Sequence, residues 1–195
     1  MAAPARQRIL DATARLLREK GFARLTTREI AQAADAAEGS ITKNFGGKLG
    51  LLTALLTTDL PEVAAWRDAL TPPTPQRADL AATLTRAAGA AIDYYAAALP
   101  LVAGAASDAA LLAAYRATNS ASGTGPQVAV REMTDYLAAW QQRGALDPGA
   151  DPGALALMFC GAAQVQAWAD YFSGPDVLPG SRADRVDQVV TALLR

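Results

Sequence analysis

The sequence contains no histidine and only one cysteine, Cys160, among its 195 residues. A disulfide framework is therefore excluded, and the side chains that most often bind metals or shuttle protons are missing. The sequence also has no glycine-rich loop that could cradle a phosphate and no cluster of metal-ligating residues. An enzyme is the weaker alternative on these grounds, and we expect no catalytic residue, no metal and no cofactor. Cys160 is expected to be a small core residue rather than a redox sensor.

Long uncharged apolar runs are also missing. Apolar residues make up 51% of the chain, yet no run approaches the roughly 18–20 uncharged apolar residues that a membrane helix needs. The first ten residues, MAAPARQRIL, lack the apolar core and the cleavage site of a signal peptide. We therefore expect a soluble, cytoplasmic protein with no membrane partner.

Strand-type alternation is nearly absent, and alanine, leucine and arginine dominate, so the sequence predicts an all-α protein of about nine helices. Proline and glycine cluster at intervals that suit helix ends. Pro61 falls inside the first long apolar segment and should kink that helix or divide it near Leu60. The expected helices cover residues 5–20, a short segment from 27, and then 38–45, 48–70, 76–97, 100–118, 126–143, 151–172 and 182–195.

Residues 26–48, TTREIAQAADAAEGSITKNFGGK, have the pattern of two short helices joined by a tight turn. Thr26 precedes Glu29 by three residues, which is the spacing of a capping box, so a helix should begin at Thr27. Small and apolar residues suit the crossing of the two helices: Ile30, Ala31, Ala34, Ala36, Ile41 and Phe45. The opposite face carries groups able to meet base edges or phosphates: Glu38, Ser40, Thr42, Lys43 and Asn44. A purely structural three-helix bundle would also have a polar outer face.

The wider stretch RQRILDATARLLREKGFARLTTREIAQAADAAEGSITKNFGGKLGLLTAL resembles the N-terminal DNA-binding region of the TetR family of bacterial transcriptional regulators. The agreement includes the first helix, then TT..IA..A, and then GSI before F..K..LL. The resemblance implies a helix-turn-helix DNA-binding domain over residues 1–47 and a larger helical effector-binding and dimerisation domain over residues 48–195. It also implies contacts to DNA phosphates from Thr27 and Arg28, to the major groove from Ser40, Lys43 and Asn44, and to the DNA backbone from Lys48.

Three residues depart from the family pattern. Asp35 stands where the turn usually has glycine, although Asp tolerates a left-handed conformation better than most residues. Ala37 replaces the usual capping Ser or Thr ahead of the recognition helix. Thr42 stands where most members have a tyrosine that touches a phosphate. These departures argue for a different operator or weaker DNA binding, and the sequence leaves open whether binding is weakened.

Charge is unevenly distributed along the chain. Residues 1–50 carry nine Lys or Arg and five Asp or Glu, whereas residues 51–195 carry nine and fourteen. Chance variation between segments is the alternative to a basic nucleic-acid-binding head on an acidic body. One head with so few cations should bind weakly. We therefore expect a homodimer on double-stranded operator DNA, with two heads reaching major grooves about 34 Å apart.

Apolar residues recur at helical spacing in the last two expected helices. In the family these helices pair with those of a second subunit, although ordinary packing within one chain would produce the same stripes. The predicted dimer interface consists of Leu155, Phe159, Ala162, Val165, Val186, Val190 and Leu193, and Met158, Trp168 and Val189 share the stripes.

The family also binds a small effector between its fourth and eighth helices. Aromatic residues at helical spacing are more often core than pocket, but several here have a polar end and the surrounding helices are rich in alanine. The predicted ligand-binding residues are Trp66, Tyr94, Tyr95, Tyr115, Met133, Tyr136, Trp140 and Gln164, with Asp93, Arg116 and Asn119 as further polar groups. The resulting hypothesis is a repressor released from a pseudo-palindromic operator by a small apolar or aromatic effector. The alternative is a helical small-molecule-binding or scaffold protein that has lost DNA binding.

Overall fold

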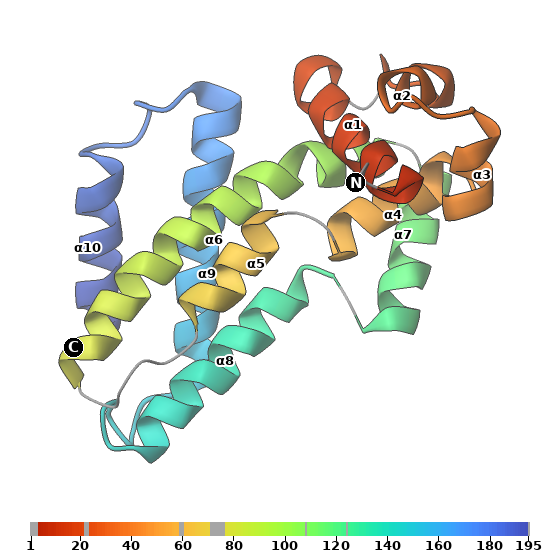
Figure 1. Cartoon of the computed structure of the whole chain (residues 1–195). Coiled ribbons are helices and arrows are strands. Elements are labelled where there is room, and N and C mark those ends of the chain that lie inside the picture. The colour runs from red at the N-terminus through yellow and green to blue at the C-terminus, as the bar shows by residue number, and fades with distance from the viewer. Residues whose placement is uncertain are drawn as a thin grey trace. The chain divides into compact units, whose positions relative to one another are not determined.

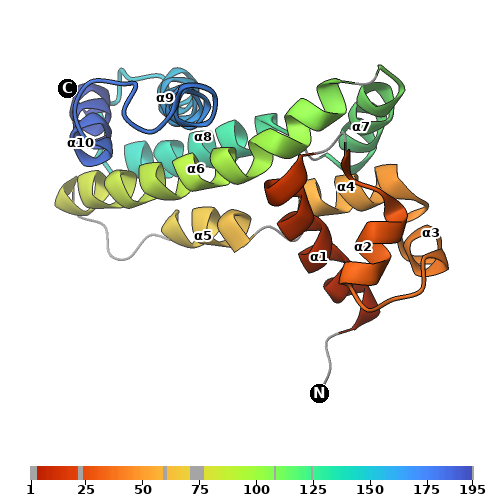
Figure 2. The ribbon, with the colours of Figure 1, turned by 90° about the horizontal axis from the view of Figure 1, so that it is seen from above.

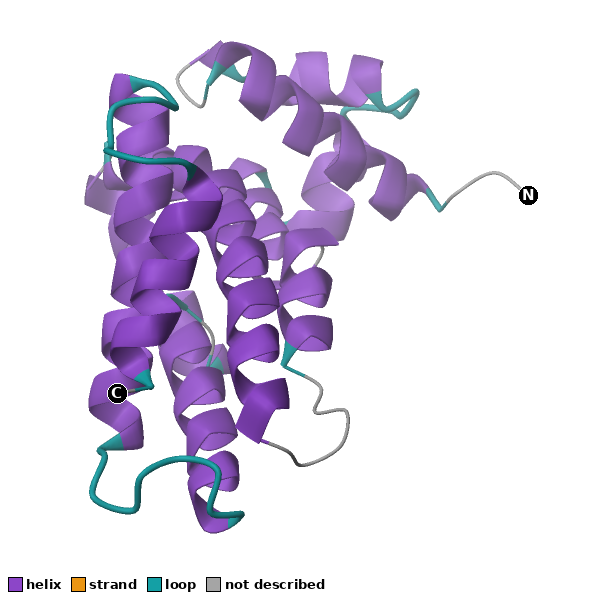
Figure 3. Cartoon of the chain, turned by 90° about the vertical axis from the view of Figure 1, so that its left-hand side faces the viewer, coloured by secondary structure: helices purple, strands orange, loops and turns teal. Residues whose placement is uncertain are grey.

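The computed structural model describes residues 4–21, 24–58, 61–70, 77–107, 109–123 and 125–194, and in these residues it contains ten α-helices and no strand (Figure 3). The prediction of an all-α protein is confirmed. The helices are α1 (Ala5–Lys20), α2 (Thr27–Ala33), α3 (Gly39–Phe45), α4 (Lys48–Thr58), α5 (Pro61–Ala69), α6 (Arg77–Ala106), α7 (Ala109–Ser122), α8 (Gln127–Gln142), α9 (Pro152–Ser173) and α10 (Arg182–Leu193).

The chain divides into two compact units (Figure 1). The first unit contains residues 1–60 and 98–125, which include α1 to α4, the end of α6 and all of α7. The second unit contains residues 61–97 and 126–195. The predicted functional boundary after residue 47 does not coincide with a boundary between these units, because α4 packs against α1, α3 and α7. That functional boundary stays a prediction.

The first unit has a core shared by its short helices. Its fully buried side chains include Ile9 and Leu10 from α1, Ile30 from α2, Ile41 from α3 and Leu51 from α4. Helices α1, α2 and α3 all contact one another, and α1 and α3 also contact α4 (Figure 2). Helices α2, α3 and α4 are each too short to be stable in water alone, so the core that they share with α1 holds them in place.

The second unit is built around α8 and α9, which pack along each other. Its core includes Trp66 from α5, Leu84 from α6, Trp140 from α8, Phe159 from α9 and Val190 from α10. Helix α9 begins at a strong N-terminal signal, because the Asp151 carboxylate accepts hydrogen bonds from the backbone of Gly153 and Ala154 and proline occupies the first helical position.

Two expected helix boundaries are resolved near prolines. Pro61 begins α5, so the long apolar segment is divided into two helices there, which is one of the two alternatives that the sequence offered. Residues 59–60 lie outside the described residues. Residues 71–75, which form the expected break TPPTP, also lie outside them. The predicted break at Leu99 and Pro100 is wrong, because α6 continues to Ala106 with Pro100 inside it. An interior proline costs a helix about 3 kcal/mol or more, and burial of Leu99, Leu101 and Ala105 around it offsets that cost.

Helix α6 contains the stretch that bears most directly on the expectation that no membrane helix is present. By length and composition alone, Leu80–Ala106 is apolar enough to cross a membrane, and 44% of its most apolar window is buried inside the structure. Arg86 and Asp93 interrupt the stretch, which is why a search for uncharged runs misses it. Buried helices of soluble proteins pass the same test, so this helix is weak evidence for a membrane span.

Candidate DNA-binding surface and ligand-binding core

The start of α2 is fixed by a reciprocal pair of hydrogen bonds. The Glu29 backbone N–H donates to Thr26 Oγ1 at 3.2 Å, and the Thr26 backbone N–H donates to Glu29 Oε2 at 3.3 Å. Lys20 Nζ also donates to Glu29 Oε1 at 3.2 Å. The hydrogen bonds from Lys20 and Thr26 hold the pKa of Glu29 below its usual value. The predicted capping box is confirmed, and it places Thr27 and Arg28 in the first turn of α2.

The turn between α2 and α3 contains the left-handed residue that the sequence suggested. Asp35 has φ of 47° and is the only non-glycine with positive φ in the described part of the chain. Arg8 of α1 reaches this turn and donates from Nε to the Ala34 carbonyl at 3.0 Å and from Nη2 to the Asp35 carbonyl at 2.9 Å. Sequence reasoning missed Arg8, since 26 residues separate it from the turn. Its guanidinium satisfies carbonyls that end α2, so the strained turn is held from α1.

Helix α3 presents the predicted polar face to solvent. Ile41 is fully buried and anchors the helix, while Thr42, Lys43 and Asn44 are exposed and Ser40 is half-buried. The helix begins without a side-chain cap, because Glu38 occupies the N-cap position and makes no capping hydrogen bond. The missing cap agrees with the loss of Ser or Thr at Ala37.

Two of the predicted DNA-contacting residues are hydrogen-bonded to each other. Thr27 Oγ1 lies 2.8 Å from Glu38 Oε1 and donates to it. This bond ties the first turn of α2 to the start of α3. A carboxylate therefore lies beside the residues predicted to meet phosphates, so an approaching phosphate must compete with Glu38 for the Thr27 hydroxyl.

The C-terminal end of α3 passes closely against the beginning of α4. The Arg6 guanidinium stacks over the Phe45 ring at 5.3 Å from its centroid. A Cβ on Gly50 would lie 1.7 Å from the Phe45 carbonyl oxygen, so only glycine fits there. Lys48 is half-buried at the start of α4, and burial lowers the pKa of its ammonium group. The structure thus brings Lys48 to the end of the same short helix that carries Lys43 and Asn44.

In the second unit, the predicted ligand-binding residues Trp66, Met133, Tyr136 and Trp140 join the apolar core. Trp66 Nε1 donates to Glu132 Oε2 at 2.9 Å. In contrast, the Tyr136 hydroxyl and Trp140 Nε1 are buried with no hydrogen-bond partner among the described residues. The two rings meet edge to face, with centroids 6.2 Å apart. A buried donor without a partner costs about 1–3 kcal/mol, so these two groups are available to a bound acceptor.

Tyr95 and Gln164 line an open groove of about 620 Å³ that also includes Cys160. The Tyr95 and Cys160 side chains are hydrogen-bonded, and burial raises the pKa of both groups, that of Cys160 to about 11. The Cys160 thiol therefore stays protonated near neutral pH, in line with the expectation of an inert core residue. The Tyr94 and Tyr95 rings are tilted by 52° to each other, with centroids 5.1 Å apart.

The remaining predicted ligand-binding groups belong to other elements. Tyr115, Arg116 and Asn119 belong to α7 in the first unit. Asp93 accepts a hydrogen bond from Arg182 Nη2 at 2.8 Å and so ties α6 to α10. The spacing of residues within one helix cannot predict such a hydrogen bond between two helices.

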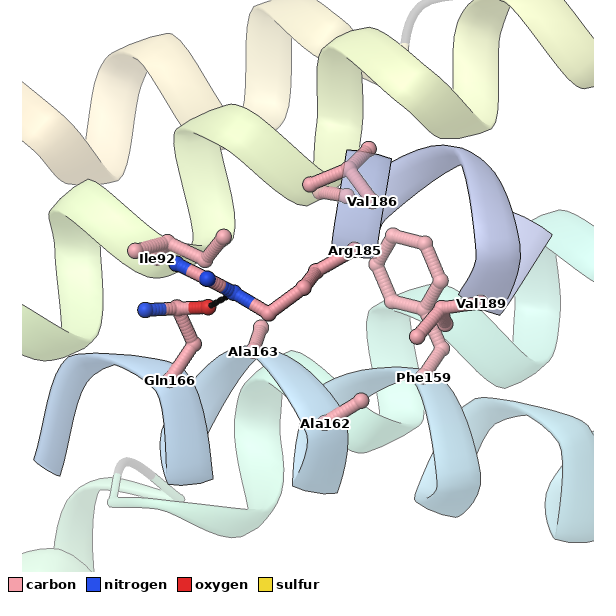
Figure 4. A pocket seen from close by; sticks show the side chains of 9 residues that line it. Ile92, Phe159, Ala162, Ala163, Gln166, Arg185, Val186 and Val189 are labelled. Carbon is pink, nitrogen blue, oxygen red and sulfur yellow. Dashed lines mark hydrogen bonds between the residues drawn. The ribbon is translucent and has the colours of Figure 1, made fainter. Parts of the chain in front are cut away.

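A small pocket lies between α6, α9 and α10 (Figure 4). Its volume is about 30 Å³, which is room for little more than a water molecule. Arg185 points into it, donates from Nε to Gln166 Oε1, and donates from Nη1 to the carbonyls of Leu178, Pro179 and Gly180. Arg185 therefore holds residues 178–180, the loop before α10, by hydrogen bonds and does not form a site for a ligand.

The predicted dimer-interface residues divide by burial. Phe159, Val186, Val190 and Leu193 lie in the core of their own chain, and Leu155 packs against that core. Val165 is exposed and Ala162 is half-buried. The large exposed apolar side chains of α9 are Leu157, Met158, Val165, Trp168, Tyr171 and Phe172. Sequence reasoning missed Tyr171 and Phe172, although they extend the spacing of Val165 and Trp168.

The fold combines a helix-turn-helix head with a larger helical body. Residues 9–55 match the family model for bacterial regulatory proteins of the tetR family. Over 54 residues the chain is 48% identical to an uncharacterised HTH-type transcriptional regulator, YvkB, from Bacillus subtilis, and the match spans 28% of this chain and 29% of that relative.

Solved structures extend the similarity to the whole fold. A protein described as a TetR-family transcriptional regulator from Mesorhizobium loti has a TM-score of 0.71 and 19% identity, with 97% of this chain and 95% of that chain covered. The regulator FadR from Bacillus subtilis, in complex with stearoyl-CoA, has a TM-score of 0.62 and 15% identity, with 96% and 97% covered. By its head, the chain is therefore similar to the TetR family of bacterial transcriptional regulators, and over most of its length it shares the fold of a solved structure described as a TetR-family regulator.

Proposed function

We propose that this protein is a ligand-responsive DNA-binding transcriptional regulator, a repressor released from a pseudo-palindromic operator by a small apolar or aromatic effector. The observation that carries the proposal is the exposed polar face of α3, anchored from behind by the buried Ile41. Ser40, Lys43 and Asn44 on this face can meet base edges in a major groove. Arg28 and Lys48, at the starts of α2 and α4, supply cations for phosphates.

Weak binding by a single head supports a homodimer. The head carries few cations, and each neutralised phosphate adds only part of the affinity. Two heads related by a two-fold axis would reach major grooves about 34 Å apart, which explains why the operator should be pseudo-palindromic. Because the proposed partner is DNA, the proposed site of action is the cytoplasm.

A titration of the protein against the intergenic DNA next to its own gene tests DNA binding. We expect dimer stoichiometry, resistance to a competitor duplex and a steep loss of affinity with added salt. Replacing Lys43 and Asn44 with alanine should weaken binding at least about 30-fold, since each base contact is worth about 1–3 kcal/mol. Arg143→Ala, which removes one exposed positive charge from the end of α8, is the matched control.

The departures at Asp35, Ala37 and Thr42 favour one alternative, a helical small-molecule-binding or scaffold protein that has lost DNA binding. Absence of any retarded species at low salt would support that alternative and reject the regulator. Equal binding by the wild type and the Lys43 and Asn44 variant would instead reject α3 as the reading helix.

The unpartnered donors in the second unit support the effector. The Tyr136 hydroxyl and Trp140 Nε1 lie among apolar side chains, so an apolar or aromatic molecule bearing a hydrogen-bond acceptor would satisfy them. An effector that binds better to the DNA-free conformation must weaken operator binding by the coupling factor, about 5–150-fold. A thermal-shift screen of hydrophobic molecules measures binding, and Tyr136→Phe, which keeps the ring, should reduce the shift. No shift with any compound would leave the effector without support.

A further inference from the structure

The open groove of about 620 Å³ lies wholly within the second unit, between α6, α8 and α9. Residues from 126 to 134 line one side of it and residues from 157 to 164 of α9 line the other, and its surface is mostly apolar. Helices α8 and α9 run in opposite directions (Figure 1), so the groove follows both helices for about 10 Å. Its volume is within the range of ligand pockets, about 300–1,000 Å³.

Arg131 is the only charged residue that lines this groove. It is exposed, and it forms no hydrogen bond or ion pair with the described part of the chain. The next residue, Glu132, does not neutralise it, because the Glu132 carboxylate accepts hydrogen bonds from Arg67 Nε at 3.0 Å and from Trp66 Nε1 at 2.9 Å. The groove thus combines an apolar surface with one guanidinium that the described residues leave unpaired.

The other polar side chains of the groove do not offset this charge. The Tyr95 hydroxyl and the Cys160 thiol are hydrogen-bonded to each other, and burial raises the pKa of both groups, that of Cys160 to about 11. Both groups therefore stay protonated near neutral pH. The Thr134 hydroxyl donates to the Val130 carbonyl of its own helix at 2.8 Å. The lining of the groove consequently carries a single positive charge, that of Arg131.

We infer that the groove binds an amphipathic anion, whose carboxylate or sulfonate group pairs with Arg131 and whose apolar or aromatic part lies along Val130 and Gly161. The planar guanidinium can donate two parallel, charge-assisted hydrogen bonds to such a headgroup. A Cβ added to Gly161 would meet no atom within 4 Å, so the surface of α9 is open there to a ring or a chain.

The charge of the ligand follows from Arg131. A cation would be repelled by the guanidinium. A neutral apolar molecule would cover part of the guanidinium and remove water from it without providing a partner, which costs free energy. An anion replaces that water with an ion pair at the edge of an apolar surface, where the attraction is stronger than in open solvent. The ligand class is therefore an aromatic or aliphatic acid rather than a hydrocarbon or an amine.

Two dyes with the same ring system test the charge. The anion 1-anilinonaphthalene-8-sulfonate and the neutral 1-anilinonaphthalene are titrated by fluorescence into the full chain without DNA. Arg131→Gln should weaken binding of the anion at least about fivefold, because a hydrogen-bonded charge is lost, and should change binding of the neutral dye less than about twofold. Arg131→Lys should restore part of the loss. Arg143→Gln, which removes another exposed positive charge at the end of α8, is the matched control.

Filling the groove tests where the dyes bind. Gly161→Leu places a side chain in the open space, and leucine favours a helix more than glycine does, so the fold should be kept, as circular dichroism melts will check. Binding of both dyes should weaken at least about tenfold, because the ligand and the new side chain cannot occupy the same space. Phe172→Ser, which alters an exposed apolar residue of α9 outside the groove, should change binding less than about twofold.

Three outcomes overturn the inference. One is that Arg131→Gln weakens both dyes equally or neither of them. Another is that a folded Gly161→Leu variant binds the anion as tightly as the wild type does. The third is that Gly161→Leu lowers the dimer content in sedimentation while dye binding is unchanged, which assigns the groove to a second copy of the chain.

The inference rests on the proposed function only for the step from binding to regulation, and the outcomes keep the two apart. Neither Tyr136 nor Trp140 lines the groove, so Tyr136→Phe should leave binding of the anionic dye unchanged. Arg131-dependent binding of that dye by a protein that binds no operator keeps the anion site and rejects the regulator. Operator binding without Arg131-dependent binding of the dye rejects the anion site and keeps the regulator.

Discussion

At the scale of single residues, the turn between α2 and α3 shows how an unfavourable backbone conformation is tolerated. Asp35 adopts a left-handed φ of 47° without being glycine, and Arg8 hydrogen-bonds to its carbonyl from another helix. The sequence revealed the exception, because Asp stands where the family has glycine. It did not reveal the compensation, because Arg8 is distant in the chain.

Replacing Asp35 with glycine should stabilise the protein. A left-handed non-glycine residue costs about 1–2 kcal/mol, and part of this is returned as extra freedom of the unfolded chain. We expect the free energy of unfolding to rise by up to about 1 kcal/mol, measured by urea denaturation. Ala36→Gly, one residue further on and without positive φ, should lower it. A loss of stability in Asp35→Gly would mean that the aspartate side chain itself stabilises the turn.

The capping box predicts a pH dependence. The pKa of Glu29 is lowered in the folded protein, mainly by the Lys20 and Thr26 hydrogen bonds, so its contribution is present above the usual value of 4.5 and is lost as pH falls through the folded pKa. Wild type should therefore melt at a higher temperature than Glu29→Gln at neutral pH. The difference should shrink as the pH is lowered below about 4.5. A difference that does not depend on pH would show that the Glu29 charge is irrelevant.

At the scale of elements, the placement of α3 depends on its junction with α4. Helix α3 has seven residues, no side-chain cap and one fully buried anchor, Ile41. It cannot be stable alone, and its position follows from what its ends contact. The Phe45 backbone packs directly on Gly50, so the geometry of the polar face is set at a residue that does not lie on it.

Substituting Gly50 with alanine should destabilise the head. The new Cβ would lie 1.7 Å from the Phe45 carbonyl oxygen and 2.9 Å from its carbon, both of them backbone atoms that cannot move independently. Overpacking of this kind costs about 1–3 kcal/mol or more. The matched control is Gly39→Ala at the start of α3, where no atom lies within 4 Å and stability should be kept. Equal melting temperatures for the two variants would contradict the close approach.

At the scale of the whole molecule, the chain passes between its two compact units at three places. The changes occur after residues 60, 97 and 125, and Pro61, Pro100 and Pro126 lie at or just beyond them. Pro100 removes a hydrogen bond inside α6, whereas Pro61 and Pro126 stand at the starts of α5 and α8, where the backbone N–H has no helical partner. In the proposed regulator, these segments connect the unit that would bind the effector to the unit that contains the head.

Replacing Pro100 with alanine tests this route. The substitution restores a hydrogen-bond donor inside α6 and should raise the melting temperature, since an interior proline costs about 3 kcal/mol. With a stiffer passage, we expect the effector to weaken operator binding by a smaller factor than in the wild type, measured as the ratio of DNA affinities with and without the effector. Val102→Ala, on the same helix, is the control. An unchanged ratio would remove Pro100 from the coupling.

The sequence by itself determined the helical class, the capping box at Thr26, the left-handed turn at Asp35 and the resemblance of the head to the TetR family. These features depend on periodicity, caps and turn residues, which act within a few positions of the chain. Only the tertiary structure decided that α6 continues through Pro100, that Arg8 holds the turn, and that Val186 and Val190 are core while Trp168 and Phe172 are exposed. Burial depends on which helices pack together. The same helical spacing of apolar residues is found on a face that packs into the core and on a face that stays exposed.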